Sequence, residues 1–170
     1  AAGMPPQLTA DTGLDALTHA VEGYTCSWHT DISDGLCVKA ARLVFENLPR
    51  VVADGSDMQA RERMHNAATC AGLGFGNAMA AIAHSMGHVL GSAFHVPHGR
   101  AVGLCLPYTI EFAARTAPER FAELSAVLGL SRTEGEAGAR ALAPDYYKVQ
   151  ITVPPSQSGT PPEWVWVVRM

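Results

Sequence analysis

The sequence predicts a mainly α-helical domain, and three observations lead to this expectation. Apolar side chains recur at helical spacing in successive segments, with Gly and Pro between them. Residues 57–92 are rich in alanine, methionine and glycine, which suits helices that approach closely. Hydrophobic residues make up 48% of the 170 residues and charged residues 16%, a balance typical of one packed domain or two small ones.

Two helices are expected in the first part of the chain. Over residues 8–25 an apolar stripe lies on one helix face, and Thr9 or Asp11 could cap the start. The stripe consists of Leu14, Leu17 and Val21. A second helix is expected over residues 31–48, capped by Asp31 or Ser33 and ended by Pro49, with a loop over 49–56.

The alanine-rich middle of the chain is expected to form two helices, over about 57–74 and 77–92. The glycine-rich residues 72–76 lie between helical patterns rather than after a strand. They therefore indicate a helix break or a close packing contact, and not a dinucleotide-binding loop. Residues 93–99 are expected to form a loop because they contain Pro97 and Gly99.

Further helices are expected over about 100–114, bent or begun at Pro107, and over 118–129, followed by a weak helix at 133–143. Residues 146–153 and 163–168 then resemble strands and could form a β-hairpin. We therefore divide the chain into a helical domain, residues 1–143, and an atypical strand-like tail, residues 144–170.

Composition excludes several classes of protein. A net charge of -4 gives no basic footprint for nucleic acid, and no apolar run is long enough to cross a membrane. No secretory signal is visible at the first residues. The four cysteines are scattered without a Cys-x-x-Cys pair, so we expect reduced, mostly buried thiols in a cytoplasmic protein. The sequence leaves open whether the chain forms a homo-oligomer.

Histidines and one aspartate form the most informative pattern. Asp15 and His19 are four residues apart on one expected helix, and His84 and His88 are four apart on another. Positions i and i+4 share a helix face, and His98 follows in the next loop. A carboxylate with three imidazoles suits Fe(II) or Zn(II) with a position open for substrate. A single pair of this kind is more often an ordinary polar contact, so spacing alone leaves both interpretations open.

The residues around these positions carry a resemblance to a known family. The segments MPPQLTADTGLDALTHAVEGY (4–24) and AIAHSMGHVLGSAFHVPHGRAVGLCLP (81–107) resemble the two signature regions of iron-containing (group III) alcohol dehydrogenases. The resemblance covers about residues 4–130 and not the tail. It implies the helical bundle of the family's C-terminal, metal-binding domain, which is of the dehydroquinate synthase-like type.

The resemblance also implies roles for individual residues. Asp15, His19, His84 and His98 match the family's metal ligands. His88 matches a histidine near the substrate that is usually not a ligand, so we expect a proton-relay or orienting role; the alternative is an ordinary helix histidine. The other histidines match no ligand position and are expected to be ordinary polar residues; they are His29, His65 and His95.

The function implied is metal-dependent interconversion of a small alcohol and its aldehyde, with Fe²⁺, or alternatively Zn²⁺, and NAD or NADP as cofactors. In the family a separate N-terminal domain binds the dinucleotide, and nothing in this sequence resembles its phosphate loop. We therefore expect a fragment that carries the metal site and part of the substrate site. The alternative is a non-catalytic metal-binding or structural helical module.

Overall fold

The computed structural model describes residues 1–130, and within this range the chain is helical, with no strand. The helices in chain order are α1 (Pro6–Thr25), α2 (Asp31–Ala53), α3 (Met58–Gly76), α4 (Ile82–Phe94), α5 (His98–Ala113) and α6 (Pro118–Val127). The predicted mainly α fold class is confirmed. The expected helix at 133–143 and the strand-like tail at 144–170 lie outside the described residues.

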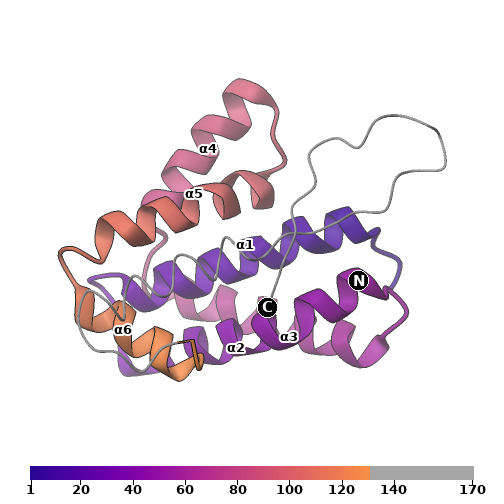
Figure 1. Ribbon diagram of the computed structural model, residues 1–170, viewed down its shortest axis with the longest axis horizontal. Helices are drawn as coiled ribbons and strands as arrows, with labels where there is room; N and C mark the ends of the chain where they lie inside the picture. The colour runs from indigo at the N-terminus through magenta and orange to yellow at the C-terminus, as the bar shows by residue number, and fades with distance from the viewer. Residues whose placement is uncertain (131–170) are drawn as a thin grey trace.

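Helix α1 is the central element of the bundle (Figure 1). It packs against α2 and α3 on one side and against α5 on the other, while α4 packs mainly on α5 and projects from the body. Its alanines alternate with buried Leu17, Val21 and Tyr24, so apolar surface is removed from water nearly all round the helix. Burial of one such large side chain contributes about 1.5–3 kcal/mol.

The first helix begins earlier than expected, and neither proposed capping residue caps it. It starts at Pro6, a residue that is pre-organised for the first helical position and has no N–H to satisfy. The side chains of Thr9 and Asp11 instead bind distant arginines. Arg61 Nη1 donates to Thr9 Oγ1 at 2.8 Å, and Arg100 pairs with Asp11. The side-chain oxygens of Thr9 and Asp11, which were expected to cap the helix, therefore accept hydrogen bonds from other helices instead.

Two expectations for the second helix are also wrong. Thr30, not Asp31 or Ser33, is the N-cap residue of α2, although Ser33 completes a capping box by hydrogen bonding back to Thr30. The helix does not end before Pro49 but continues to Ala53. Burial of Leu48 and Val51 on either side of the proline offsets the backbone hydrogen bond that proline cannot make.

The glycine-rich segment 72–76 makes a close packing contact, which is one of the two alternatives that the sequence indicated. A Cβ atom at Gly74 would lie 2.6 Å from Cys37 Sγ and 3.3 Å from the Ser33 carbonyl oxygen. The segment 72–76 belongs to α3, and the chain leaves the helix only after it. The fourth helix accordingly starts five residues later than expected, at Ile82.

The remaining boundaries differ by a few residues. The expected loop at 93–99 is shorter, because α4 runs to Phe94 and α5 already begins at His98. Pro107 lies inside α5 rather than at its start. Helix α6 ends at Val127, and Gly129 follows in a left-handed conformation with φ of 75°.

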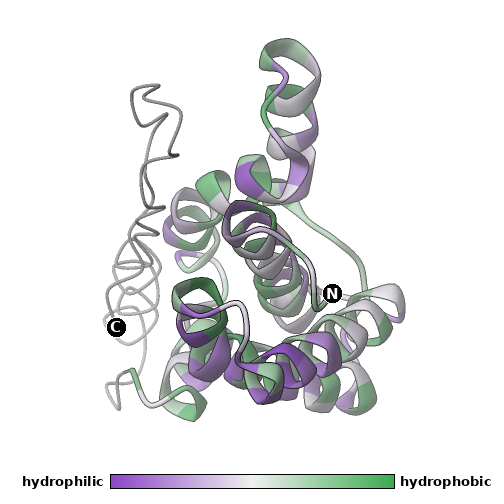
Figure 2. Ribbon diagram, turned by 90° about the vertical axis from the view of Figure 1, so that its right-hand side faces the viewer, coloured by the Kyte–Doolittle hydropathy of each residue, from purple (hydrophilic) through white to green (hydrophobic). Residues whose placement is uncertain are grey.

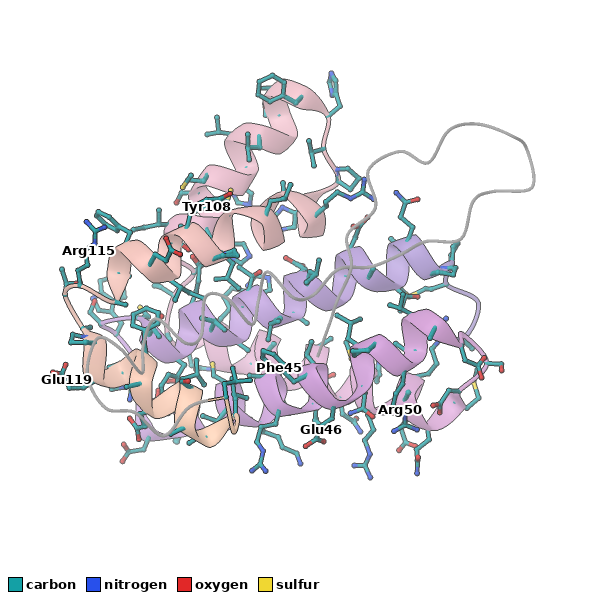
Figure 3. The ribbon with its side chains drawn as sticks, viewed as in Figure 1. Phe45, Glu46, Arg50, Tyr108, Arg115 and Glu119 are labelled. Atoms are coloured by element: carbon teal, nitrogen blue, oxygen red, sulfur yellow. The ribbon has the colours of Figure 1, made fainter. Side chains whose placement is uncertain are left out.

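Many of the charged residues lie on the outer surface. Hydrophilic residues gather along the lower, outer sides of α2 and α3 (Figure 2), and Glu46 and Arg50 of α2 point away from α1 (Figure 3). None of the described helices combines the length with the apolar character that a membrane crossing requires.

Arg120 fastens α6 to the central helices. Its guanidinium lies 3.9 Å from the centre of the Tyr24 ring, donates to the Tyr24 carbonyl oxygen, and donates to Asp34 Oδ1 at 2.8 Å. One side chain therefore joins α6 to α1 and α2 through a cation–π contact and charge-assisted hydrogen bonds.

Arg120→Ala is expected to lower the free energy of unfolding by about 2 kcal/mol, since these contacts are lost together. The matched control is Arg115→Ala, which removes an exposed arginine just before α6 (Figure 3) and should change stability by less than about 0.5 kcal/mol. Urea unfolding followed by circular dichroism measures both values. Equal effects of the two substitutions would contradict this role of Arg120.

The four cysteines are free, as expected from their spacing, but two of them are only half-buried. Cys37 and Cys105 are buried, whereas Cys26 and Cys70 are partly exposed. Burial, and then the carboxylate of Asp34, raise the pKa of Cys37 to about 12. Burial likewise raises the pKa of Cys105.

Thiol titration of the native protein at pH 8 is therefore expected to be biphasic. Cys37 and Cys105 should resist a disulfide reagent because the thiolate is the reactive form and both thiols are covered. In guanidinium chloride all four thiols should react at one rate. Rapid reaction of four thiols in the native protein would show that the core between α1, α2 and α5 is open.

Candidate metal centre

Three helices bring the expected ligand residues together. Asp15 and His19 lie one turn apart in the middle of α1, His84 lies in the first turn of α4, and His98 is the first residue of α5. The i, i+4 spacing on α1 places its two side chains on one face, with Asp15 Oδ1 and His19 Nε2 3.7 Å apart. All four residues predicted as ligands are thus found in one place.

One carboxylate oxygen is the centre of the group. Asp15 Oδ1 lies 3.6 Å from His84 Nε2 and 3.2 Å from His98 Nε2. Ligand atoms of Asp15, His19 and His84 lie within 4.8 Å of one another. Two ligands of a tetrahedral zinc ion, each about 2.1 Å from the metal, are roughly 3.4 Å apart. The separations from Asp15 therefore have the size that a shared cation requires.

Buried polar atoms of the same residues lack hydrogen-bond partners. Asp15 Oδ1 and His84 Nε2, which face each other at 3.6 Å, and Nδ1 of the His19 ring have no hydrogen-bond partner among the described residues. A buried polar atom without a partner costs about 1–3 kcal/mol, so such atoms seldom gather by chance. A divalent cation would accept the lone pairs of the carboxylate and the imidazoles, and the residues present therefore fit an iron or zinc ion.

The charge states of the donors also suit a cation. Burial raises the pKa of Asp15, but the neighbouring His84, His19 and His98 outweigh it and lower that pKa below its ordinary value. Burial and the adjacent His84 lower the pKa of His19 to about 4. At neutral pH the group thus offers an ionised carboxylate and a neutral imidazole, which are the forms that bind metal.

His84 differs from His19 because it contacts two carboxylates. Burial lowers the pKa of His84, but contacts with Asp15 and Glu22 outweigh burial and raise that pKa to about 9. In the metal-free protein a proton on His84 therefore occupies the position next to Asp15 that a cation would take. Metal binding is expected to release it.

Glu22 is the residue that sequence reasoning missed. Its carboxylate is buried and contacts His84 Nδ1 at 2.5 Å, on the side of the ring opposite Nε2. The sequence did contain a signal, because Asp15, His19 and Glu22 follow at i, i+4 and i+7 and so share one face of α1. A metal-ligating histidine almost always has such a partner on its second nitrogen.

His98 reaches the site because the start of α5 touches the backbone of α1. A Cβ atom at Gly99 would lie 2.0 Å from the Asp11 carbonyl oxygen, so only glycine allows this approach. Arg100 then holds the contact, its Nε and Nη2 donating to the two carboxylate oxygens of Asp11 at 3.1 Å each. This paired geometry holds the start of α5, and with it the backbone of His98, against α1.

The site is closed on one side and open on the other. His84 is only 6% exposed, whereas the side chain of His98 is 45% exposed. The ring of His19 is enclosed by stacking between Phe75, at 3.9 Å, and His84, at 4.1 Å between ring centres. Of the four side chains, that of His98 is the most exposed to solvent.

His88 lies on that open side. Its exposed ring is centred 5.1 Å from the ring of His98 and 6.2 Å from that of His84. This places His88 beside His84 and His98, while the ligand atoms that lie within 4.8 Å of one another belong to Asp15, His19 and His84. The proton-relay or orienting role of His88 stays a prediction.

The other histidines lie apart from the cluster. His29 Nδ1 contacts Asp34 Oδ2 at 3.1 Å, and His95 ends α4 in a left-handed conformation with φ of 56°. His65 lies within α3. The structure thus brings none of these three to Asp15.

Comparison with known proteins gives the family. The family model of the Fe-containing alcohol dehydrogenase family, C-terminal, matches residues 9–152. The chain is 43% identical over 133 residues to the NADPH-dependent butanol dehydrogenase of Clostridium saccharobutylicum, covering 78% of this chain and 34% of that protein. It is 44% identical over 124 residues to a 1-propanol dehydrogenase of Citrobacter freundii, covering 72% of this chain and 34% of that protein.

Solved structures agree with the sequence comparison. The alcohol dehydrogenase from Oenococcus oeni superposes with a TM-score of 0.82 at 38% identity, covering 86% of this chain and 39% of that one. The chain thus spans about a third of the length of the curated relatives it matches. It belongs to the iron-containing alcohol dehydrogenase family, in which it corresponds to the C-terminal helical domain.

Proposed function

We propose that this chain provides the metal site of a divalent-metal-dependent alcohol dehydrogenase, with Asp15, His19, His84 and His98 as ligands. The observation that carries the proposal is the convergence of three imidazoles on one carboxylate oxygen, at 3.2–3.7 Å, with unsatisfied buried atoms at that point. Family membership supports the same ligand set.

A bound Fe²⁺ or Zn²⁺ would act as a Lewis acid on the oxygen of an alcohol or aldehyde, while NAD or NADP would accept or supply the hydride. Relatives are named for butanol and 1-propanol, which supports a small primary alcohol as substrate. One relative is named as NADPH-dependent, and a similar structure was solved with NAD+, so the choice of nicotinamide cofactor stays open.

The protein's own residues have separate tasks in this proposal. The partly buried carboxylate of Asp15 and the ring of His19, which stacks against Phe75, would hold the cation. His98 completes the set at the open side, where substrate would enter. His88, exposed and next to His98, would exchange the alcohol proton with solvent.

The proposal is tested by metal content after anaerobic preparation and loading with Fe²⁺ or Zn²⁺. We expect about one ion per chain in the wild type and a clear loss in His98→Ala. The matched control is His88→Ala, one turn beyond His84 on α4, which should keep the ion because His88 is not a ligand. Equal metal content in the two variants would refute the assigned ligand set.

A second candidate is a metal-binding helical module without catalysis. It rests on the fold of residues 1–130, which form the helical domain of the family. Hydride transfer by the 170-residue protein with metal, NADPH and butyraldehyde separates the two candidates. Turnover well above that of His98→Ala would exclude the second one.

The predicted cytoplasmic location belongs to the same proposal. Four free cysteines and no disulfide among the described residues are compatible with a reducing compartment.

A further inference from the structure

A buried carboxylate connects the candidate metal site to the start of α4. Glu22, on α1, is 4% exposed and has three partners on a distant part of the chain. Its Oε2 accepts from the Ala81 backbone N–H at 2.8 Å, and its Oε1 accepts from the Ala83 N–H at 2.6 Å. Its third partner is His84 Nδ1, at 2.5 Å from Oε2.

The geometry determines which nitrogen of His84 carries a proton. Glu22 already accepts from two amides and, as a carboxylate, has only lone pairs to offer. His84 Nδ1 must therefore be the donor. The lone pair of the neutral ring is then on Nε2, the buried and unsatisfied nitrogen that lies 3.6 Å from Asp15 Oδ1.

The same carboxylate sets where the ring lies. Helix α4 has no side-chain cap from its own N-cap residue, Ala81, and Glu22 satisfies two of its first amides instead. A negative charge at a helix N-terminus is also favourable. Glu22 thus binds the backbone on both sides of Ile82 and the ring of His84, so that helix start and ligand move as one unit.

We propose that Glu22 is the positioning residue of the metal centre, holding His84 in the Nδ1–H tautomer with Nε2 directed at the cation. This inference rests on the proposed function and adds a determinant of metal affinity outside the four ligands. Carboxylate partners of metal-bound histidines change affinity about 10–100-fold.

Glu22→Gln separates this role from simple space filling, because the two side chains have nearly the same shape. An amide offers one oxygen in place of two, and its NH₂ must face either the Ala83 N–H or the pair formed by Ala81 and His84. In the second arrangement His84 turns to the Nε2–H tautomer, which cannot bind a cation through that nitrogen.

The experiment is zinc titration of the wild type, Glu22→Gln and Asp57→Asn against a chromophoric chelator. Asp57 is the matched control because its carboxylate also caps a helix start, accepting from Ala60 N–H at 2.9 Å, but contacts no histidine. We expect Glu22→Gln to bind zinc about 10–100-fold more weakly and Asp57→Asn to bind within about threefold of the wild type.

Nitrogen-15 spectra of the zinc-loaded wild type give an independent readout of the tautomer. A protonated Nδ1 on His84, protected from solvent exchange, supports the inference even where Glu22→Gln fails to fold. Zinc affinity in folded Glu22→Gln within threefold of the wild type, or a protonated Nε2 on His84, overturns it. Failure of the wild type itself to bind zinc would instead overturn the proposed function.

Discussion

Gly99→Ala is expected to damage both the stability and the metal centre of this protein. The new methyl carbon would lie 2.0 Å from the carbonyl oxygen and 2.6 Å from the carbonyl carbon of Asp11, and these backbone atoms are held within the second turn of α1. Helix α5 must then move away from α1, taking His98 with it. We expect a loss of about 3 kcal/mol in unfolding free energy and at least about a tenfold loss of zinc affinity.

The control for this substitution is Gly72→Ala. Gly72 lies inside α3, and apart from its own turn of helix no described atom lies within 4 Å of the position that its Cβ would take. Alanine is the better helix former, so this change should be neutral or stabilise by up to about 1 kcal/mol. Chemical unfolding and zinc titration of both variants provide the comparison. Wild-type zinc affinity in Gly99→Ala would show that the contact between α5 and α1 does not position His98.

Asp15→Asn should have the largest effect on metal binding of any single change. Asp15 Oδ1 is the oxygen on which three imidazoles converge, and it supplies the one negative charge among the four ligands. An amide keeps the shape but removes the charge and can present N–H₂ to the cation. We expect zinc affinity to fall by more than about 100-fold, beyond the loss typical of an outer partner.

The same substitution at Asp54 is the control for the charge change. Asp54 lies in the exposed turn after α2, where its carboxylate accepts from Ser56. Asp54→Asn should leave zinc affinity within about threefold of the wild type, as measured by chelator competition. If Asp15→Asn kept wild-type affinity, a carboxylate at this position would not be a ligand.

The residues that meet at the candidate metal centre could be predicted from the sequence because part of the information is local. Spacing of i and i+4 places Asp15 and His19 on one face of any helix that includes them. The meeting of α1 with α4 and α5 is not local, and only the resemblance to a family with a known order of ligands indicated it. His98 shows the limit of local reasoning, since it was expected in a loop and is the first residue of α5.

Errors in the helix boundaries have a common physical cause. Pro49 was expected to end α2, but the burial of Leu48 and Val51 continues the helix beyond it. Thr9 and Asp11 looked like caps, but arginines from other helices use their oxygens. In each case tertiary packing outweighed a local preference, which is common because a single cap or backbone hydrogen bond contributes only about 1 kcal/mol.

Glu22 was missed for a related reason. Nothing in its immediate neighbourhood distinguishes it from a solvent-facing glutamate, and its partners at Ala81, Ala83 and His84 are about sixty residues away. The one signal in the sequence was that Glu22 shares a face of α1 with Asp15 and His19. That signal points to the metal centre only when this face of α1 is known to be buried.

The proposed ligand set can be tested by a crystal structure of the zinc-loaded protein with anomalous scattering recorded at the zinc edge. We expect one strong peak about 2.0–2.2 Å from an Asp15 carboxylate oxygen and from a nitrogen of each of His19, His84 and His98. A zinc ion bound elsewhere on the chain, or bound without the Asp15 carboxylate, would contradict this ligand set.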